Sequence, residues 1–132
     1  MKRIATMAVT LAVVTMACGG GGGGITPPPA SVDRSQMVSA VSEADKNTLC
    51  DWFAPLVGGY GSTPSCPDYL LMADANRMEC VASFPVCTLS LGQFEDCIVE
   101  IVKAQNACTA QAFASAMANP NCQAAIAANC FN

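Results

Sequence analysis

The most regular pattern of apolar residues follows the segment SLGQ at positions 90–93. Apolar side chains recur there at the i, i+3, i+4, i+7 and i+8 spacing that lines one face of an α-helix. These apolar positions are Phe94, Cys97, Ile98, Ile101 and Val102. The charged positions between them are predicted to face solvent, and they are Glu95, Asp96, Glu100 and Lys103. Because the serine and glutamine of SLGQ fit a capping box, the helix is predicted to begin at this segment.

A second amphipathic pattern predicts a helix that begins at SEAD, positions 42–45, which also fits a capping box. Its apolar stripe is formed by Leu49, Trp52, Phe53 and Leu56. The stripe predicts that Trp52 belongs to the core rather than to an exposed binding site shared with Asp51. The segment GGYG at 58–61 is predicted to stop the helix, and Pro55 to kink or shorten its last turn.

Shorter patterns predict the remaining helices. One helix is predicted over residues 74–83, with Met78 and Val81 turned inward. Thr109 is predicted to cap a further helix. Asn119, followed directly by a proline, is predicted to serve as a fresh N-cap and to start another first turn.

Two short apolar runs are the only candidates for β-structure. The runs YLLM at 69–72 and TLSL at 88–91 could pair as a small two-stranded ribbon. The whole pattern therefore predicts a mainly α fold of about four short helices, with or without this minor two-stranded ribbon.

The N-terminus has the layout of an export signal. A basic MKR precedes an eleven-residue apolar run at 4–14, which is too short to span a bilayer as a permanent helix. The following TMAC resembles a bacterial lipoprotein signal, although Thr15 and Met16 depart from its usual residues. The resemblance implies cleavage after residue 17, acylation of Cys18 and, from Gly20, sorting to the outer membrane. The alternative is an ordinary secretory signal that leaves Cys18 as a stray thiol.

The organisation of the rest follows from composition. Residues 1–17 are predicted to be the signal peptide, and residues 18–41 the lipidated cysteine with a glycine- and proline-rich tether of roughly 25–30 Å average length. Residues 42–132 are predicted to form one cysteine-rich helical domain.

Cysteine is the most over-represented residue type, with nine in 132 residues. No C-x-x-C pair and no histidine are present, so a disulfide framework fits better than a zinc site or another metal site. Setting aside Cys18 leaves an even number, and these are predicted to be disulfide-bonded: Cys50, Cys66, Cys80, Cys87, Cys97, Cys108, Cys122 and Cys130. On the order of a hundred pairings are open. A Cys122–Cys130 bridge is excluded only if both lie on one unbroken helix, about 12 Å apart.

Three segments carry a resemblance to a known group of proteins. They are LCDWFAPLVGGYG at 49–61, MECVASF at 78–84 and CTLSLGQFEDC at 87–97. With the lipobox and polyglycine before them, they resemble the cysteine-rich lipoproteins of myxobacterial type. Pro55 departs from the unbroken first helix usual in that group. The resemblance implies a location and a disulfide-rich domain, and it implies no activity.

Charge and chemistry narrow the functional classes. The net charge of −4 falls to about −6 without Lys2 and Arg3, so no basic surface is expected for nucleic acid. Without histidine, Ser-His and Cys-His catalytic pairs are excluded, no cofactor is expected, and the chain is predicted not to be an enzyme. Glu95, Asp96 and Glu100 are interpreted as a solvated face rather than as catalytic or calcium-binding carboxylates.

The sequence thus predicts an envelope lipoprotein held in the membrane by the lipid on Cys18, in the outer membrane and facing the periplasm or the surface. Its preferred role is structural or protein-interacting, with an unidentified envelope protein as partner. The alternative is a small-ligand or lipid carrier, and an enzyme or accessory subunit is less favoured. A cavity of several hundred Å³ would favour the carrier. A contiguous exposed apolar patch would favour the interaction module, and carboxylates with raised pKa in a cleft would favour the enzyme.

Overall fold

Five α-helices make up most of the computed structural model, which describes residues 24–67 and 70–131. The predicted signal peptide, Cys18 and the polyglycine as far as residue 23 lie outside these described residues. In chain order, the elements are the 3-10 helix η1 (Val38–Ala40), α1 (Glu43–Leu56), α2 (Arg77–Ala82), α3 (Leu91–Ala107), α4 (Ala110–Ala118) and α5 (Pro120–Ala127). The predicted mainly α, disulfide-stapled fold is confirmed.

Side-chain caps fix where the helices begin. Ser42, Ser90, Thr109 and Asn119 each accept a hydrogen bond from a backbone N–H in the first turn of their helix, as predicted. Helix α2 begins three residues later than predicted, because Asn76 caps it by accepting from the backbone N–H of Glu79 at 3.0 Å.

Helix α1 ends just before the glycines that were predicted to stop it. Pro55 occupies the last turn of the helix, which ends at Leu56. Gly58 and Gly59 then take positive φ angles of 102° and 100°, and the Gly59 N–H donates to the Ala54 carbonyl at 2.8 Å. Only glycine adopts this backbone without strain, so the helix ends here in a left-handed turn.

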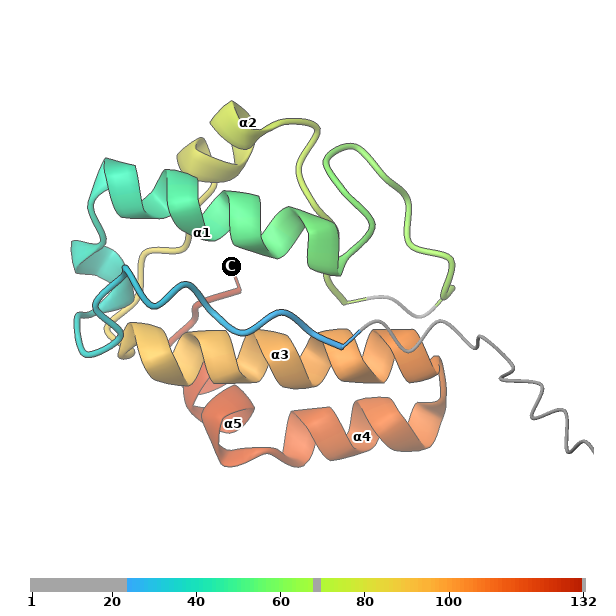
Figure 1. The fold of residues 1–132 in the computed structure, drawn as a ribbon. Helices are drawn as coiled ribbons and strands as arrows, with labels where there is room; N and C mark the ends of the chain where they lie inside the picture. The colour runs from blue at the N-terminus through green and yellow to red at the C-terminus, as the bar shows by residue number, and fades with distance from the viewer. Residues whose placement is uncertain (1–23, 68–69, 132) are drawn as a thin grey trace, which may run out of the picture.

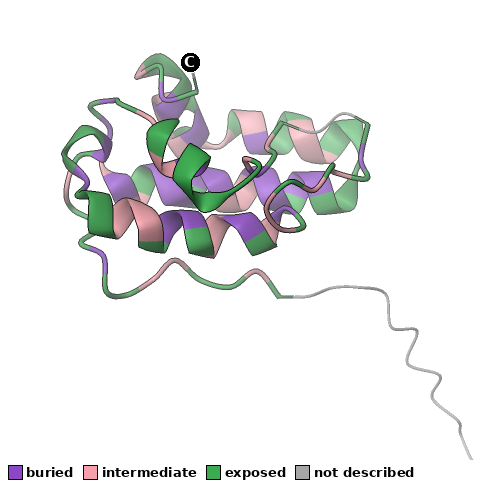
Figure 2. Ribbon diagram, turned by 90° about the horizontal axis from the view of Figure 1, so that it is seen from above, coloured by how far each residue is buried: buried purple, intermediate pink, exposed green. Residues whose placement is uncertain are grey.

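The helices form two layers (Figure 1). Helices α1 and α2 pack on each other, and we call them the upper layer; α3 packs on α4 and α5, which together are the lower layer. Figure 2 shows buried residues gathered on the inner sides of the helices and exposed residues on the outer sides. The buried cluster joins α1, α3, α5 and the segments between them into one core.

Four disulfides pair all eight predicted cysteines of the domain. Two of them lie within a layer: Cys50–Cys80 joins α1 to α2, and Cys97–Cys122 joins α3 to α5. The other two connect segments that are far apart in the sequence, with separations of 42 and 43 residues. Cys66–Cys108 ties the loop after α1 to the end of α3, and Cys87–Cys130 ties the α2–α3 connection to the chain after α5. The bridges therefore hold the layers together as well as the helices within them.

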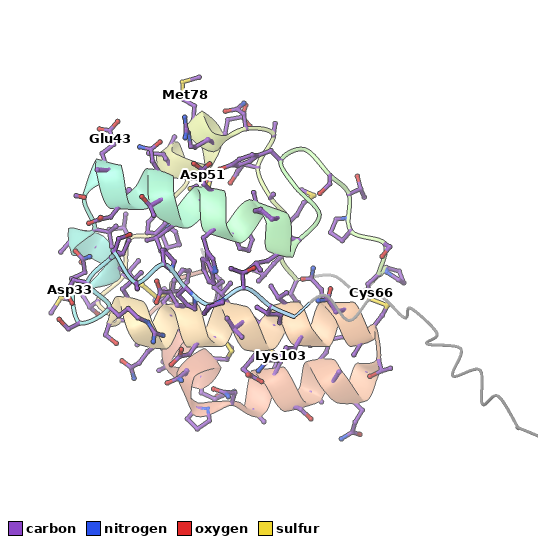
Figure 3. The ribbon with its side chains drawn as sticks, in the orientation of Figure 1. Asp33, Glu43, Asp51, Cys66, Met78 and Lys103 are labelled. Atoms are coloured by element: carbon purple, nitrogen blue, oxygen red, sulfur yellow. A yellow bond between two sulfur atoms is a disulfide. The ribbon has the colours of Figure 1, made fainter. Side chains whose placement is uncertain are left out.

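Three side-chain and pairing predictions were wrong. Met78 is 79% exposed and points away from the protein in Figure 3, since the short α2 turns this side outward. Glu95 is only 1% exposed. Residues 70–72 do not pair with residues 88–91 in a ribbon; within the described residues the one β contact is an isolated bridge between Met37 and Ser90.

The segment before α1 pairs with residues 87–90 instead. The backbone N–H groups of Val38 and Ser39 donate to the carbonyls of Leu89 and Cys87 at 2.9 and 3.0 Å. Val32, Val38 and Val41 are buried. Residues 32–41, which were predicted as tether, thus pack as part of the domain because their valines complete its core.

Candidate functional site

An open cavity of about 380 Å³ lies between the two layers. Its walls come from α1, from α3 and from residues between 70 and 85, and the chain after α5 adds Cys130 and Phe131. Leu49, Trp52 and Phe53 line it on the α1 side, and Leu91, Phe94 and Ile98 on the α3 side. Because α1 packs mainly on α2 and α3 on α4 and α5, the facing side chains of α1 and α3 do not fill the space between them. The result is a mostly apolar pocket.

The mouth of the cavity is also apolar. Leu70, Met72 and Phe131 line the cavity and are at the same time exposed to solvent. The Phe131 ring lies 5.8 Å from the ring of Phe94, measured between centroids. Part of the mouth therefore presents apolar side chains to solvent.

A buried glutamine holds one wall in place. Gln105 of α3 accepts hydrogen bonds from the backbone N–H groups of Leu70 and Leu71, at 3.0 and 2.6 Å, through its Oε1. Its Nε2 donates to the Leu71 carbonyl at 2.9 Å. These three bonds fix the 70–71 segment, which has no regular secondary structure, against the helix.

Glu95 is the buried charged group of the cavity wall. Its Oε2 accepts from Arg34 Nε at 2.6 Å, while its Oε1 has no hydrogen-bond partner among the described residues. Burial raises the pKa of the Glu95 carboxyl, and the bond from Arg34 opposes that rise. An unpartnered buried oxygen is costly, so within the described residues Glu95 is the lining residue whose buried carboxylate lacks a full set of hydrogen bonds.

Arg34 belongs to an extended segment, residues 24–37, which we call the strap. Figure 1 shows the strap running along α3 beneath α1. Trp52 Nε1 donates to the Thr26 carbonyl at 2.9 Å, and the Leu91 and Gly92 N–H groups donate to the carbonyls of Gln36 and Arg34, both at 2.8 Å. The strap thus satisfies backbone donors at the N-terminus of α3. A Cβ on Gly92 would lie 3.3 Å from the Arg34 carbonyl oxygen, so glycine permits this close approach.

A second polar cluster lies outside the cavity. Asp51 accepts from Arg77 Nη1 at 2.8 Å and from the Tyr60 hydroxyl at 3.0 Å. Burial, followed by the bond to Asp51, raises the pKa of Tyr60 to about 12, and the bond from Arg77 lowers the pKa of Asp51. The Ser62 hydroxyl donates to the Val57 and Gly59 carbonyls. These groups satisfy one another, so the cluster fastens the glycine loop and α2 to α1.

The carboxylates considered at 95, 96 and 100 do not form one site. Asp96 is exposed and accepts from Arg34 Nη2 at 2.5 Å, and Glu100 pairs with Lys103 at 2.6 Å on the surface. Among the described residues, no group of three or more His, Cys, Asp or Glu side chains could hold a metal ion. No helix in this part of the chain is both long and apolar enough to cross a membrane.

Three residues that shape the site were missed from the sequence: Arg34, Glu95 as a buried group, and Gln105. A signal existed for two of them. Glu95 lies four residues after Leu91 and three before Ile98, and Gln105 lies four after Ile101, so both fall on or beside the apolar stripe of α3. Nothing local marks Arg34, whose partner is 61 residues away.

Comparisons of the chain with protein-family models, with curated proteins and with solved structures find no match.

Proposed function

We propose that the domain binds a small, mainly apolar molecule in the cavity between its two layers. The observation that carries this proposal is the cavity itself, about 380 Å³ in volume and lined largely by leucine, isoleucine and aromatic side chains. At about 30 Å³ for each water-sized group, it holds roughly a dozen non-hydrogen atoms. This size is within the range of ligand pockets, which span about 300–1,000 Å³.

The carrier role is preferred to the structural or protein-interaction role because of where the exposed apolar residues lie. Leu70, Met72 and Phe131 belong to the cavity mouth. The other large exposed apolar residues come from four separate segments and are Met37, Met78, Val86 and Ile126. The catalytic alternative gains little support, since within the described residues only two carboxylates, Glu95 and Asp74, line the cavity, and Glu95 is engaged by Arg34.

We further propose that the carrier works at the cell envelope, anchored by a lipid on Cys18. Ile25 packs against the core and lies only seven residues after Cys18. Seven fully extended residues span about 25 Å at most. A lipid on Cys18 would therefore hold Ile25 within about 25 Å of the anchor, no farther than the average length predicted for the tether. An apolar ligand could then exchange between the cavity and the nearby bilayer.

Filling the cavity tests the binding proposal. Leu71→Trp places a bulky ring on a partly buried wall residue and is expected to weaken binding of a neutral naphthalene fluorophore at least about tenfold. Fluorescence titration of the purified domain measures the effect. Ile126→Trp is the matched control, because Ile126 is exposed on α5 and does not line the cavity. Equal binding by both variants and the native protein, or no binding at all, would contradict the proposal.

The anchoring proposal has its own test in cells. Cys18→Ser is expected to leave an unprocessed precursor that takes up no radiolabelled palmitate, because the acylated sulfur is gone. Thr15→Leu, which restores the usual lipobox residue, should mature and be labelled. Normal maturation of Cys18→Ser would instead support the ordinary secretory signal.

A further inference from the structure

Resting on the proposed function, we propose that the ligand of the cavity carries a protonated amine beside its apolar body, and that Glu95 binds this amine. Glu95 lines the cavity, is 1% exposed and has one carboxylate oxygen, Oε1, with no hydrogen-bond partner among the described residues. The other oxygen is engaged by Arg34 at 2.6 Å. Oε1 is enclosed by protein atoms, so binding requires the carboxylate to turn about its soft terminal torsion, which also moves Oε2 against Arg34.

The charges around the cavity select a cation over an anion. Its two charged lining residues are Asp74 and Glu95, and neither lysine nor arginine lines it. Arg34 is the cation paired with Glu95, and it is shared between Glu95 and Asp96. One guanidinium thus faces two carboxylates, while the Asp74 carboxylate accepts from the neutral hydroxyl of Ser83 at 3.2 Å. Lys46 lies outside the lining, with its Nζ 5.6 Å from the ring centroid of the lining residue Phe84. A ligand with a carboxylate or phosphate would meet like charge, whereas an amine adds the missing positive charge.

The same oxygen distinguishes an amine from an alcohol. Either group can donate a charge-assisted hydrogen bond to the ionised Oε1, but only the ammonium adds the Coulomb attraction between two opposite unit charges. The apolar side chains of Phe94, Ile98 and Leu91 line the same cavity and lower the local dielectric, which strengthens the difference. The class expected is therefore a primary amine on an apolar chain or ring of about ten carbons, which fits the dozen atoms that the cavity holds.

A matched series of ten-carbon ligands tests the inference. Decylamine and decanoic acid, each below its micellar concentration, and decanol, below its solubility limit, compete with the neutral naphthalene fluorophore for the purified domain at pH 7. We expect decylamine to bind at least about tenfold more tightly than decanol, and decanoic acid to bind most weakly. Glu95→Gln should remove the preference for decylamine over decanol. Asp96→Asn, which also loses a carboxylate bonded to Arg34 but does not line the cavity, should keep it.

The outcomes separate this inference from the proposed function. If the three ligands compete equally, or if Glu95→Gln folds with the native circular dichroism spectrum and keeps the amine preference, Glu95 does not select the ligand and the inference is overturned, while binding in the cavity stands. If the native protein prefers decanoic acid, the ligand class is wrong. If the fluorophore itself does not bind, the proposed function is contradicted, whatever the class of ligand. Because the native selectivity is read without any variant, misfolding of Glu95→Gln cannot conceal a negative result.

Discussion

Replacing Cys87 and Cys130 together by alanine is expected to lower the free energy of unfolding by about 4 kcal/mol. The bridge closes a loop with a sequence separation of 43 residues, and freeing a loop of that size raises the entropy of the unfolded chain by this amount. Typical domains of this size are stable by only about 5–15 kcal/mol, so the loss is a large share of the total. Urea unfolding followed by circular dichroism measures it.

The same variant is expected to lose ligand binding while it is still folded. Cys130 and Phe131 line the cavity, and the bridge to Cys87 is the covalent link that holds them there. Cys66→Ala with Cys108→Ala is the matched control, because that bridge has a separation of 42 residues and Cys108 is exposed. The control should lose similar stability but keep fluorophore binding. Retained binding in the Cys87/Cys130 variant at low temperature would show that the C-terminal wall is dispensable.

Replacing Arg34 by methionine is expected to lower the free energy of unfolding by about 2 kcal/mol at pH 7. The change leaves the buried Glu95 carboxylate without its partner and also removes bonds to Asp96 and the Gly92 carbonyl. Breaking a fully buried pair costs about 3–5 kcal/mol. The value here is set lower because the Arg34 side chain is 44% exposed and solvent screens part of the interaction.

The loss is expected to shrink as the pH falls. Burial raises the pKa of Glu95 in the folded state, so the folded protein takes up the proton more readily than the unfolded chain. Stability from this group is therefore present at acid pH and is lost as the pH rises through the folded-state pKa. Without Arg34, which opposes the rise, the pKa goes higher still. The difference between native and variant should thus be largest near pH 7 and smallest near pH 4.

A double variant separates the charge from the packing. In Arg34→Met/Glu95→Gln the buried charge is absent, so part of the stability lost in Arg34→Met should return at pH 7, and the pH dependence that Glu95 contributes should disappear. If Arg34→Met is as stable as the native protein at pH 7, or if its loss is the same at pH 4, the buried pair is not what holds the strap to α3.

Local signals in the sequence were sufficient for the helices. Ser42, Ser90, Thr109 and Asn119 cap their helices because a short polar side chain reaches a backbone N–H two or three residues away, an interaction that needs no tertiary contact. The α3 stripe through Phe94, Ile98 and Ile101 is buried as its spacing predicts. The even count of domain cysteines likewise predicted a closed disulfide set.

Tertiary structure decided what lies next to each helix, and with it the candidate site. Periodicity placed Glu95 in solvent, but the strap covers that flank of α3 and brings Arg34 to it from 61 residues away. Pairing Cys87 with Cys130 required knowing where the end of the chain returns, and the cavity exists because α1 and α3 each pack mainly on other helices. Caps and stripes are encoded within a few residues, so the sequence determined the helices. The buried charge, the bridges and the cavity depend on contacts between distant segments, which only the folded chain defines.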